Sequence, residues 1–122
     1  MTRFLAVGAG GFLGAIARYA VGVLVARFWS GEFPLATFLI NVSGSFAIGL
    51  FTAMSAERLA LDPVWRLLFA TGFVGAYTTF STFEYETNRL VEVGSTGWAA
   101  TNVLASVLVG FLALRLGVAL AR

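Results

Sequence analysis

The chain contains no cysteine and no histidine, and charged residues make up only 11% of its 122 residues. These absences exclude disulfides, thiol or imidazole catalysis and most of the ligand sets that bind zinc. Lysine is also absent, so the net charge of +2 depends on arginines that are spread along the chain. They form no basic patch suited to nucleic acid, and no nucleic-acid partner is expected. The six carboxylates show no spacing typical of acid/base catalysis, so an enzyme is not expected either.

Hydrophobic residues, in contrast, make up 59% of the chain and occur in long blocks. No charge occurs between Glu32 and Glu57 or between Glu92 and Arg115. A helix of about 20 such residues spans roughly 30 Å of hydrocarbon. The pattern predicts an all-α membrane protein with a single four-helix transmembrane domain over residues 1–122. The predicted helices cover about 3–28, 34–56, 63–91 and 97–120.

The third predicted helix contains an unusual polar run. Asp62-Pro63 is typical of a helix start, with an N-cap followed by a first-turn proline. The run 75–83 then places four serine and threonine hydroxyls beside Phe80 and Phe83 where a membrane helix should be most apolar. Polar groups in hydrocarbon are costly unless they find partners or line a cavity. The sequence therefore predicts that the third helix is broken mid-membrane near 75–79.

Small and polar residues recur at every fourth position on the other helices. Ala6, Gly10, Gly14 and Arg18 predict a face of the first helix that lets a neighbouring backbone approach closely. Two polar faces follow on the second and fourth helices, formed by Thr37, Asn41, Ser45 and Gly49 and by Asn102, Ser106 and Gly110.

These polar faces are most easily satisfied across an interface between copies of the chain. The simpler alternative is that each amide or hydroxyl only holds helices together. A mid-span arginine such as Arg18, however, costs about 2.5–3.5 kcal/mol on insertion scales unless it meets water or a partner. Together with the broken helix, the pattern favours a hydrated ion pathway.

The residue chemistry leaves the ion open. Asn41, Asn102, the hydroxyls and Arg18 offer donors and positive potential, which suit an anion. The ring edges of Phe80 and Phe83 carry positive partial charge and could face an anion, although packing or lipid-facing phenylalanines are the simpler interpretation. Unwound carbonyls near Gly75 and Thr78 would instead suit a small cation.

Charge counting specifies the orientation weakly. With four spans, both termini and the 57–66 connection share one side, which carries Arg3, Arg58, Arg66 and Arg122; Arg27 and Arg89 lie on the other. The bias under the positive-inside rule is small. A chain that inserts both ways would form an antiparallel dimer.

Three segments together give the chain a specific resemblance. Over nearly its whole length it resembles the Fluc-type (CrcB-like) fluoride channel family. The matching segments are Gly10–Tyr19, Thr37–Phe46 and Gly72–Phe83, the last followed by Glu86. The resemblance implies an antiparallel, dual-topology homodimer in the lipid bilayer of a bacterial inner membrane. Two pores would let fluoride leave the cytoplasm passively.

The resemblance also implies roles for individual residues. The fluoride pore would be formed by Phe80, Phe83, Asn41, Ser81, Thr82 and Ser106. The backbone carbonyls of Gly75 and Thr78 would hold a structural sodium ion (Na+), and Arg18 would lie near the aqueous vestibule. Asn102 departs from the family pattern, because many members have a tyrosine there. Gly110 also departs from it, since some members have a serine at that position.

Two other classes of function remain as alternatives. A small four-helix exporter of cationic drugs needs a membrane-embedded carboxylate in its first helix, where this chain carries Arg18 and no acid. A non-conducting structural subunit would use the polar faces for packing alone.

Overall fold

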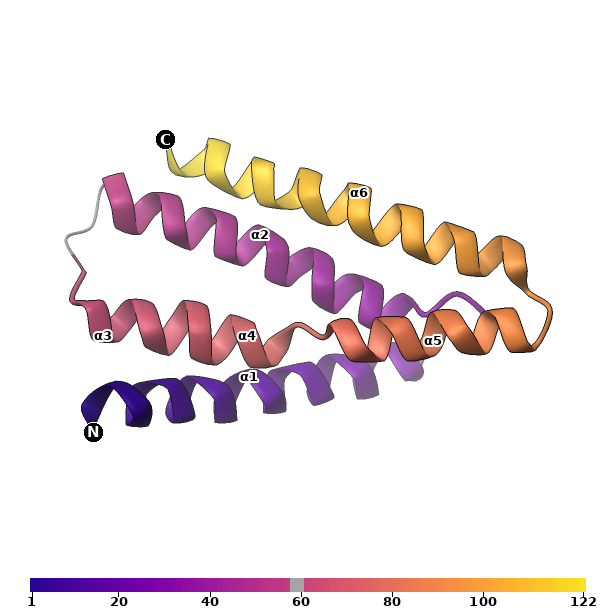
Figure 1. The fold of residues 1–122 in the computed structure, drawn as a ribbon, viewed down its shortest axis with the longest axis horizontal. Coiled ribbons are helices and arrows are strands. Elements are labelled where there is room, and N and C mark those ends of the chain that lie inside the picture. Colours follow the sequence, from indigo (N-terminus) through magenta and orange to yellow (C-terminus); the bar gives the residue numbers. More distant parts are fainter. Residues whose placement is uncertain (58–60) are drawn as a thin grey trace.

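The computed structural model describes residues 1–57 and 61–122 and is drawn in Figure 1. Arg58, which enters the charge comparison, lies outside the described residues. The all-α prediction is confirmed for the described ranges, which contain helices and no strand. The helices are α1 (Thr2–Ala26), α2 (Leu35–Glu57), α3 (Pro63–Arg66), η1 (Leu67–Val74), α4 (Gly75–Tyr77), α5 (Phe80–Glu92) and α6 (Thr96–Ala121).

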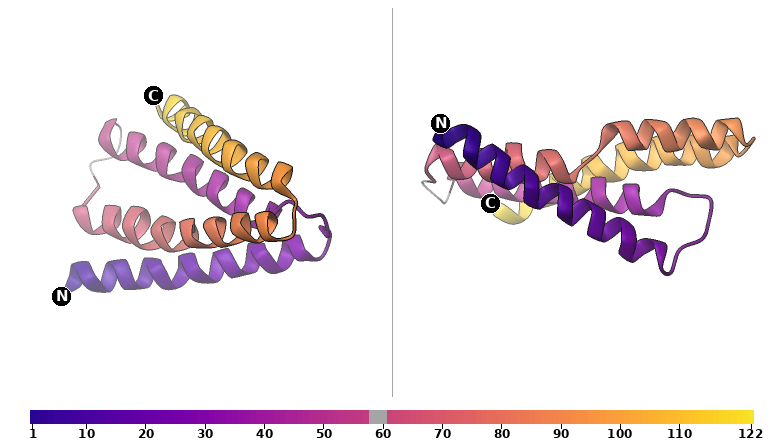
Figure 2. Two further views of the ribbon diagram at one scale, coloured as in Figure 1. Left: turned by 45° about the vertical axis from the view of Figure 1, so that its right-hand side comes forward. Right: turned by 90° about the horizontal axis from the view of Figure 1, so that it is seen from below.

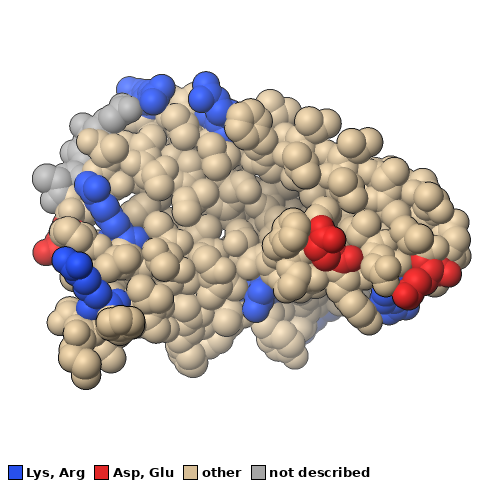
Figure 3. Space-filling model, in the orientation of Figure 1, with Lys and Arg blue, Asp and Glu red and all other residues tan. Residues whose placement is uncertain are grey.

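Three of the helices are long and apolar enough to cross a membrane, namely α1, α2 over Leu35–Ala56, and α6. Their mean hydropathy is 1.6, 1.6 and 2.3. The chain is therefore a multi-pass membrane protein. On the face drawn in Figure 3, most of the surface is uncharged, and the charged side chains gather toward the two ends except for one basic and one acidic group nearer the middle. Such a distribution suits a molecule whose middle is surrounded by hydrocarbon.

The helices form two packed pairs that lie side by side. α6 packs along α2, and α1 packs along η1 and α4. Both termini lie at the same end of the molecule as the end of α2 and the start of α3, while the α1–α2 and α5–α6 connections lie at the other end (Figures 1 and 2). The chain thus runs back and forth along one axis.

Glycines allow α1 to approach η1 at backbone distance. Ala6, Gly10 and Gly14 are buried on the face of α1 that the sequence predicts to let a neighbouring backbone approach closely. A Cβ atom at Gly10 would overlap the carbonyl oxygen of Leu68, and one at Gly14 would overlap that of Phe73. Any larger residue at these two positions would push the helices apart, so the prediction of a close-packing face is confirmed.

The segment after the second helix begins as the sequence predicts. Asp62 is the N-cap of α3, its Oδ1 accepts a hydrogen bond of 2.8 Å from Val64 N, and Pro63 is the first helical residue. The backbone then follows π-helical hydrogen bonding in η1, which the sequence did not predict. Phe69, Phe73 and Tyr77 stack at every fourth residue, with ring centroids 5.6 and 5.9 Å apart.

Candidate functional site

Two threonines interrupt the helical backbone between α4 and α5. Thr78 has φ −77° and ψ 157°, and Thr79 has φ −149° and ψ 114°, so both are extended. Threonine suits this conformation because its β-branched side chain fits extended backbone well. Thr79 also caps the next helix, since its Oγ1 accepts a hydrogen bond of 3.3 Å from Thr82 N. The interruption ends one helix and starts another within two residues.

The side chain of Asn41 on α2 makes two hydrogen bonds to the backbone of Thr79. Asn41 Oδ1 accepts a hydrogen bond of 2.8 Å from Thr79 N, and Asn41 Nδ2 donates one of 3.0 Å to Thr79 O. The amide thus pairs with Thr79 as a neighbouring strand would. Thr79 is only 8% exposed, so its N–H group depends on this partner rather than on water. One Nδ2 hydrogen of Asn41 remains for a further acceptor.

α2 makes two more contacts with the interruption beside the hydrogen bonds between Asn41 and Thr79. The hydroxyls of Ser43 and Tyr77 lie 2.9 Å apart and share a hydrogen bond. Gly44 lies against the methyl group of Thr78, and a Cβ atom at Gly44 would overlap that methyl. The interruption is therefore shaped by three neighbouring residues of α2 as well as by its own sequence.

The break also changes what two backbone carbonyls can do. In a continuous helix Gly75 O would accept from Thr79 N, and Thr78 O would accept from Thr82 N. Here Thr79 N donates to Asn41 and Thr82 N donates to Thr79 Oγ1. The two carbonyls that the resemblance assigns to a sodium ion have therefore lost their helical donors. Neutral carbonyl oxygens are suitable ligands for such a hard cation.

The interruption borders a hollow of about 380 Å³ between α2, η1, α5 and α6. Six predicted site residues line it: Asn41, Gly75, Thr78, Phe80, Phe83 and Ser106. Residues that are more than sixty positions apart in sequence thus meet at one cavity. Its side-chain polar groups are an amide and hydroxyls, and no charged residue is among its lining residues.

The two phenylalanines differ in their surroundings. Their ring centroids are 5.7 Å apart at an interplanar angle of 41°. Phe83 is 6% exposed, whereas Phe80 is 73% exposed on the outer side of the hollow. The hollow is thus bounded by one ring fixed in the chain's interior and one ring that projects from the chain.

The other predicted site residues lie outside this hollow. Ser81 and Thr82 are exposed on the first turn of α5. Arg18 is half-buried on α1, one turn before Gly22, which lines a second hollow. The structure therefore brings together six of the nine predicted residues and leaves these three around them.

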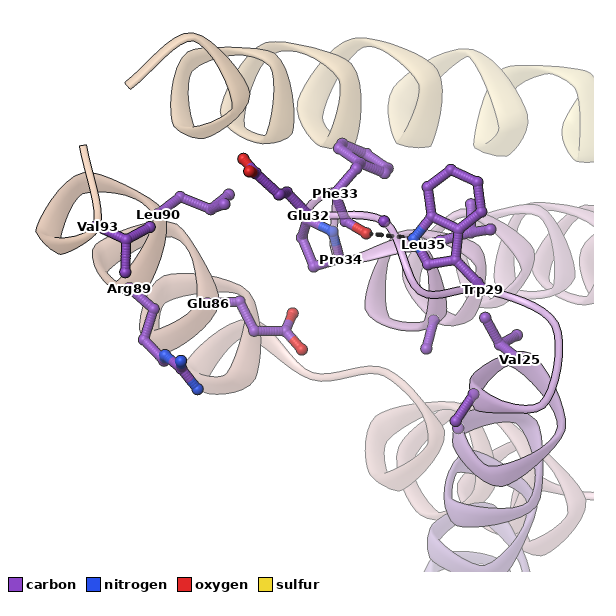
Figure 4. Close-up of a pocket in the computed structure, with 14 residues that line it drawn as sticks. Val25, Trp29, Glu32, Phe33, Pro34, Leu35, Glu86, Arg89, Leu90 and Val93 are labelled. Carbon is purple, nitrogen blue, oxygen red and sulfur yellow. Dashed lines mark hydrogen bonds between the residues drawn. The ribbon is translucent and has the colours of Figure 1, made fainter. Parts of the chain in front are cut away.

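The second hollow, of about 420 Å³, lies between the end of α1, the start of α2 and α5 (Figure 4). Glu86 of α5 points its carboxylate into this space, as Figure 4 shows. Its Oε2 atom is buried and has no hydrogen-bond partner among the described residues. The sequence identified Glu86 only as part of a matching segment, because a glutamate is usually a solvated residue.

The amides of the two polar faces have partners within the chain. The sequence favoured an interface between copies as the place where these faces are satisfied, which stays a prediction. In the structure, Asn41 pairs with Thr79, and Asn102 bonds to Thr87 and Ser106 of the same chain. Sequence reasoning also missed Thr79 and Gly44. Their only signal was their position, since Thr79 lies within the break predicted near 75–79 and Gly44 lies within the Asn41 segment.

Comparison with known proteins finds a family and several relatives to which this chain is similar. The family model described as CrcB-like protein, Camphor Resistance (CrcB), matches residues 5–118. A fluoride-specific ion channel of Acidobacterium capsulatum is 49% identical over 115 residues, covering 94% of this chain and 92% of the relative. Those of Solibacter usitatus and a Sulfurihydrogenibium species are 43% and 41% identical, and each covers at least 98% of both chains.

Proposed function

Because the chain belongs to the CrcB-like family, we propose that it is a fluoride-selective channel through which fluoride leaves the bacterial cytoplasm by passive permeation. The chain is a transport protein of a channel family and not an enzyme. The observation that carries the proposal is the hollow at the helix interruption, where an amide, hydroxyls and two aromatic rings converge.

The chemistry of the hollow suits a small anion that holds its water tightly. The remaining Nδ2 hydrogen of Asn41 and the edges of Phe80 and Phe83 offer partial positive charge without a fixed cation. A conducting site must bind the ion well enough to replace its hydration and weakly enough to release it. A lining without arginine meets the second requirement, because a full positive charge would hold fluoride too long.

The functional unit in this proposal is an antiparallel homodimer with two pores. Phe80 is 73% exposed in a single chain and lies beside the exposed Ser81 and Thr82. A second copy would cover this side and enclose the pathway, so that the exposed hydroxyls line it. Two-fold symmetry makes the two pathways equivalent. The weak arginine bias is consistent with insertion in both orientations, which an antiparallel pair requires.

A structural sodium ion completes the proposal. Gly75 and Thr78 would hold it through the carbonyl oxygens that have lost their helical donors, two from each copy. The ion would neutralise the negative ends of the carbonyl dipoles and hold the two interrupted helices together. It would not take part in conduction.

The remaining assignments concern the ends of the pathway. Arg18, one turn from the second hollow, would raise the local concentration of anions at an aqueous vestibule. The membrane is proposed to be the bacterial inner membrane.

The direct test is efflux from liposomes reconstituted with the purified full chain. A potassium ionophore lets potassium leave together with the anion, so that charge balances. A fluoride electrode then follows release from vesicles loaded with potassium fluoride, and a chloride electrode follows matched vesicles loaded with potassium chloride. Rapid fluoride release with little chloride release supports the channel. Inert vesicles would instead indicate a structural subunit, and proton-coupled uptake of a cationic dye would indicate a drug exporter. The exporter is disfavoured because α1 contains no carboxylate.

A further inference from the structure

Asn102 on α6 is the most deeply buried large side chain in the described part of the protein, at 1% exposure. It does not line either large hollow. A buried amide in an apolar helix is costly unless its polar atoms are hydrogen-bonded. Its partners therefore indicate what the residue does.

Asn102 belongs to a chain of hydrogen bonds that runs in one direction. Ser106 Oγ donates to Asn102 Oδ1 at 3.3 Å. Asn102 Nδ2 donates to Thr87 Oγ1 at 2.9 Å, and Thr87 Oγ1 donates to Phe83 O at 2.8 Å. The bond between Asn102 and Thr87 joins α6 to α5, whereas the two outer bonds each stay within one helix.

The ends of this chain are both wall residues of the first hollow. Ser106 and Phe83 line that hollow from α6 and α5 respectively. Asn102 and Thr87 lie behind the wall and connect the two. The connection also decides the direction of the Ser106 hydroxyl, because its single hydrogen points to Asn102 and leaves its lone pairs for other contacts.

We propose that Asn102 and Thr87 form a positioning pair that sets the spacing between Phe83 and Ser106 and the donor direction of the Ser106 hydroxyl. This inference rests on the proposed function, since it concerns the same anion pathway. The pair acts behind the wall and does not touch the ion. A shift of α5 along α6 would move the Phe83 ring away from Ser106 and weaken the binding of the anion in the proposed pathway.

Substitutions at Thr87 separate this role from packing alone. Thr87→Val preserves the shape of the side chain and removes the hydroxyl, whereas Thr87→Ser preserves the hydroxyl and removes a methyl group. If the pair acts through hydrogen bonds, Thr87→Val lowers fluoride efflux and Thr87→Ser retains most of it. The loss of one interhelical bond at the permeation barrier corresponds to about 3- to 18-fold slower efflux. The opposite order, with Val active and Ser impaired, would show that Thr87 only fills space.

Asn102→Leu tests the other member of the pair. Both substitutions remove the Asn102–Thr87 bond, and leucine also removes the acceptor of the Ser106 hydroxyl. Efflux should therefore fall at least as far as in Thr87→Val, and the double variant should be no slower than Asn102→Leu alone. Losses that multiply in the double variant would refute a shared role. The matched control is Thr101→Val, since Thr101 is exposed and bonds only to Gly97 O of its own helix.

Two further measurements test whether each variant keeps its assembly and whether its selectivity changes. Size-exclusion chromatography must give the wild-type elution volume for each variant, and the fluoride-to-chloride release ratio should fall together with the rate. Unchanged efflux in both Thr87→Val and Asn102→Leu would overturn the positioning role while leaving the channel intact. Absence of fluoride release from the wild-type protein would instead refute the proposed function, and the positioning role with it.

Discussion

Replacing Asn41 with leucine is the most direct test of how the helix interruption is held. Leucine has a similar size but removes both hydrogen bonds to Thr79, of 2.8 and 3.0 Å. Thr79 is 8% exposed, so water reaches its freed N–H group poorly. Its C=O group keeps a donor, because the carbonyl of an N-cap residue accepts the first hydrogen bond of its own helix. The one buried group without a partner costs about 1–3 kcal/mol.

The protein has one route to reduce this loss. If the backbone at Thr79 becomes helical, its N–H can return to Gly75 O, and the remaining loss is that of one hydrogen bond, about 0.5–1.5 kcal/mol. The same change would close the extended segment and return a donor to a carbonyl that the sodium ion is proposed to use. We therefore expect Asn41→Leu to lower both the stability and the fluoride efflux.

The free energy of unfolding is measured by denaturant titration in mixed micelles, with efflux measured on the same preparation. Thr52→Val serves as the control, because Thr52 is exposed on the same helix and its hydroxyl bonds only to carbonyls of that helix. Its effect should stay within about 0.5 kcal/mol, as for most surface substitutions. The reasoning is refuted if Asn41→Leu is as stable as Thr52→Val, since the two bonds between Asn41 and Thr79 would then contribute nothing.

Three further predictions concern the same region. Phe80→Ile should slow fluoride efflux by about tenfold or more while the proposed dimer still assembles, because it removes an aromatic edge; Phe12→Ile, similarly exposed on α1, should have little effect on efflux. Gly44→Ala should destabilise the protein by about 1–3 kcal/mol through overlap with the extended segment. In contrast, Gly8→Ala, where nothing lies within 4 Å, should be neutral or stabilising in the same titration. Replacing sodium by N-methylglucamine should reduce the dimer fraction on size-exclusion chromatography, and an unchanged fraction would count against a structural ion.

Much of the helical organisation could be predicted because it depends on local signals. Uncharged apolar blocks specify membrane helices by composition alone, and Asp62-Pro63 specifies a helix start by its capping chemistry. The small face of α1 was predictable for the same reason, since Gly10 and Gly14 share one face at helical spacing.

The candidate site could be predicted in part. Asn41, Phe80, Phe83 and Ser106 were named from the sequence, and the structure gathers them at one hollow. Their partners were not predictable. Nothing local indicates that the Asn41 amide pairs with the backbone of Thr79, which lies 38 positions away.

The sequence by itself determined that this is a helical membrane protein with a polar interruption in its third predicted helix, because burial in hydrocarbon imposes composition and spacing on each segment separately. Only the tertiary structure decided what the interruption does. Packing of α2 against the segment assigns the Thr79 backbone to Asn41, and contact between α5 and α6 assigns the Asn102 amide to Thr87. Each of these bonds satisfies a buried polar group with a partner from another helix, so the partner follows from the packing of the helices and not from local sequence.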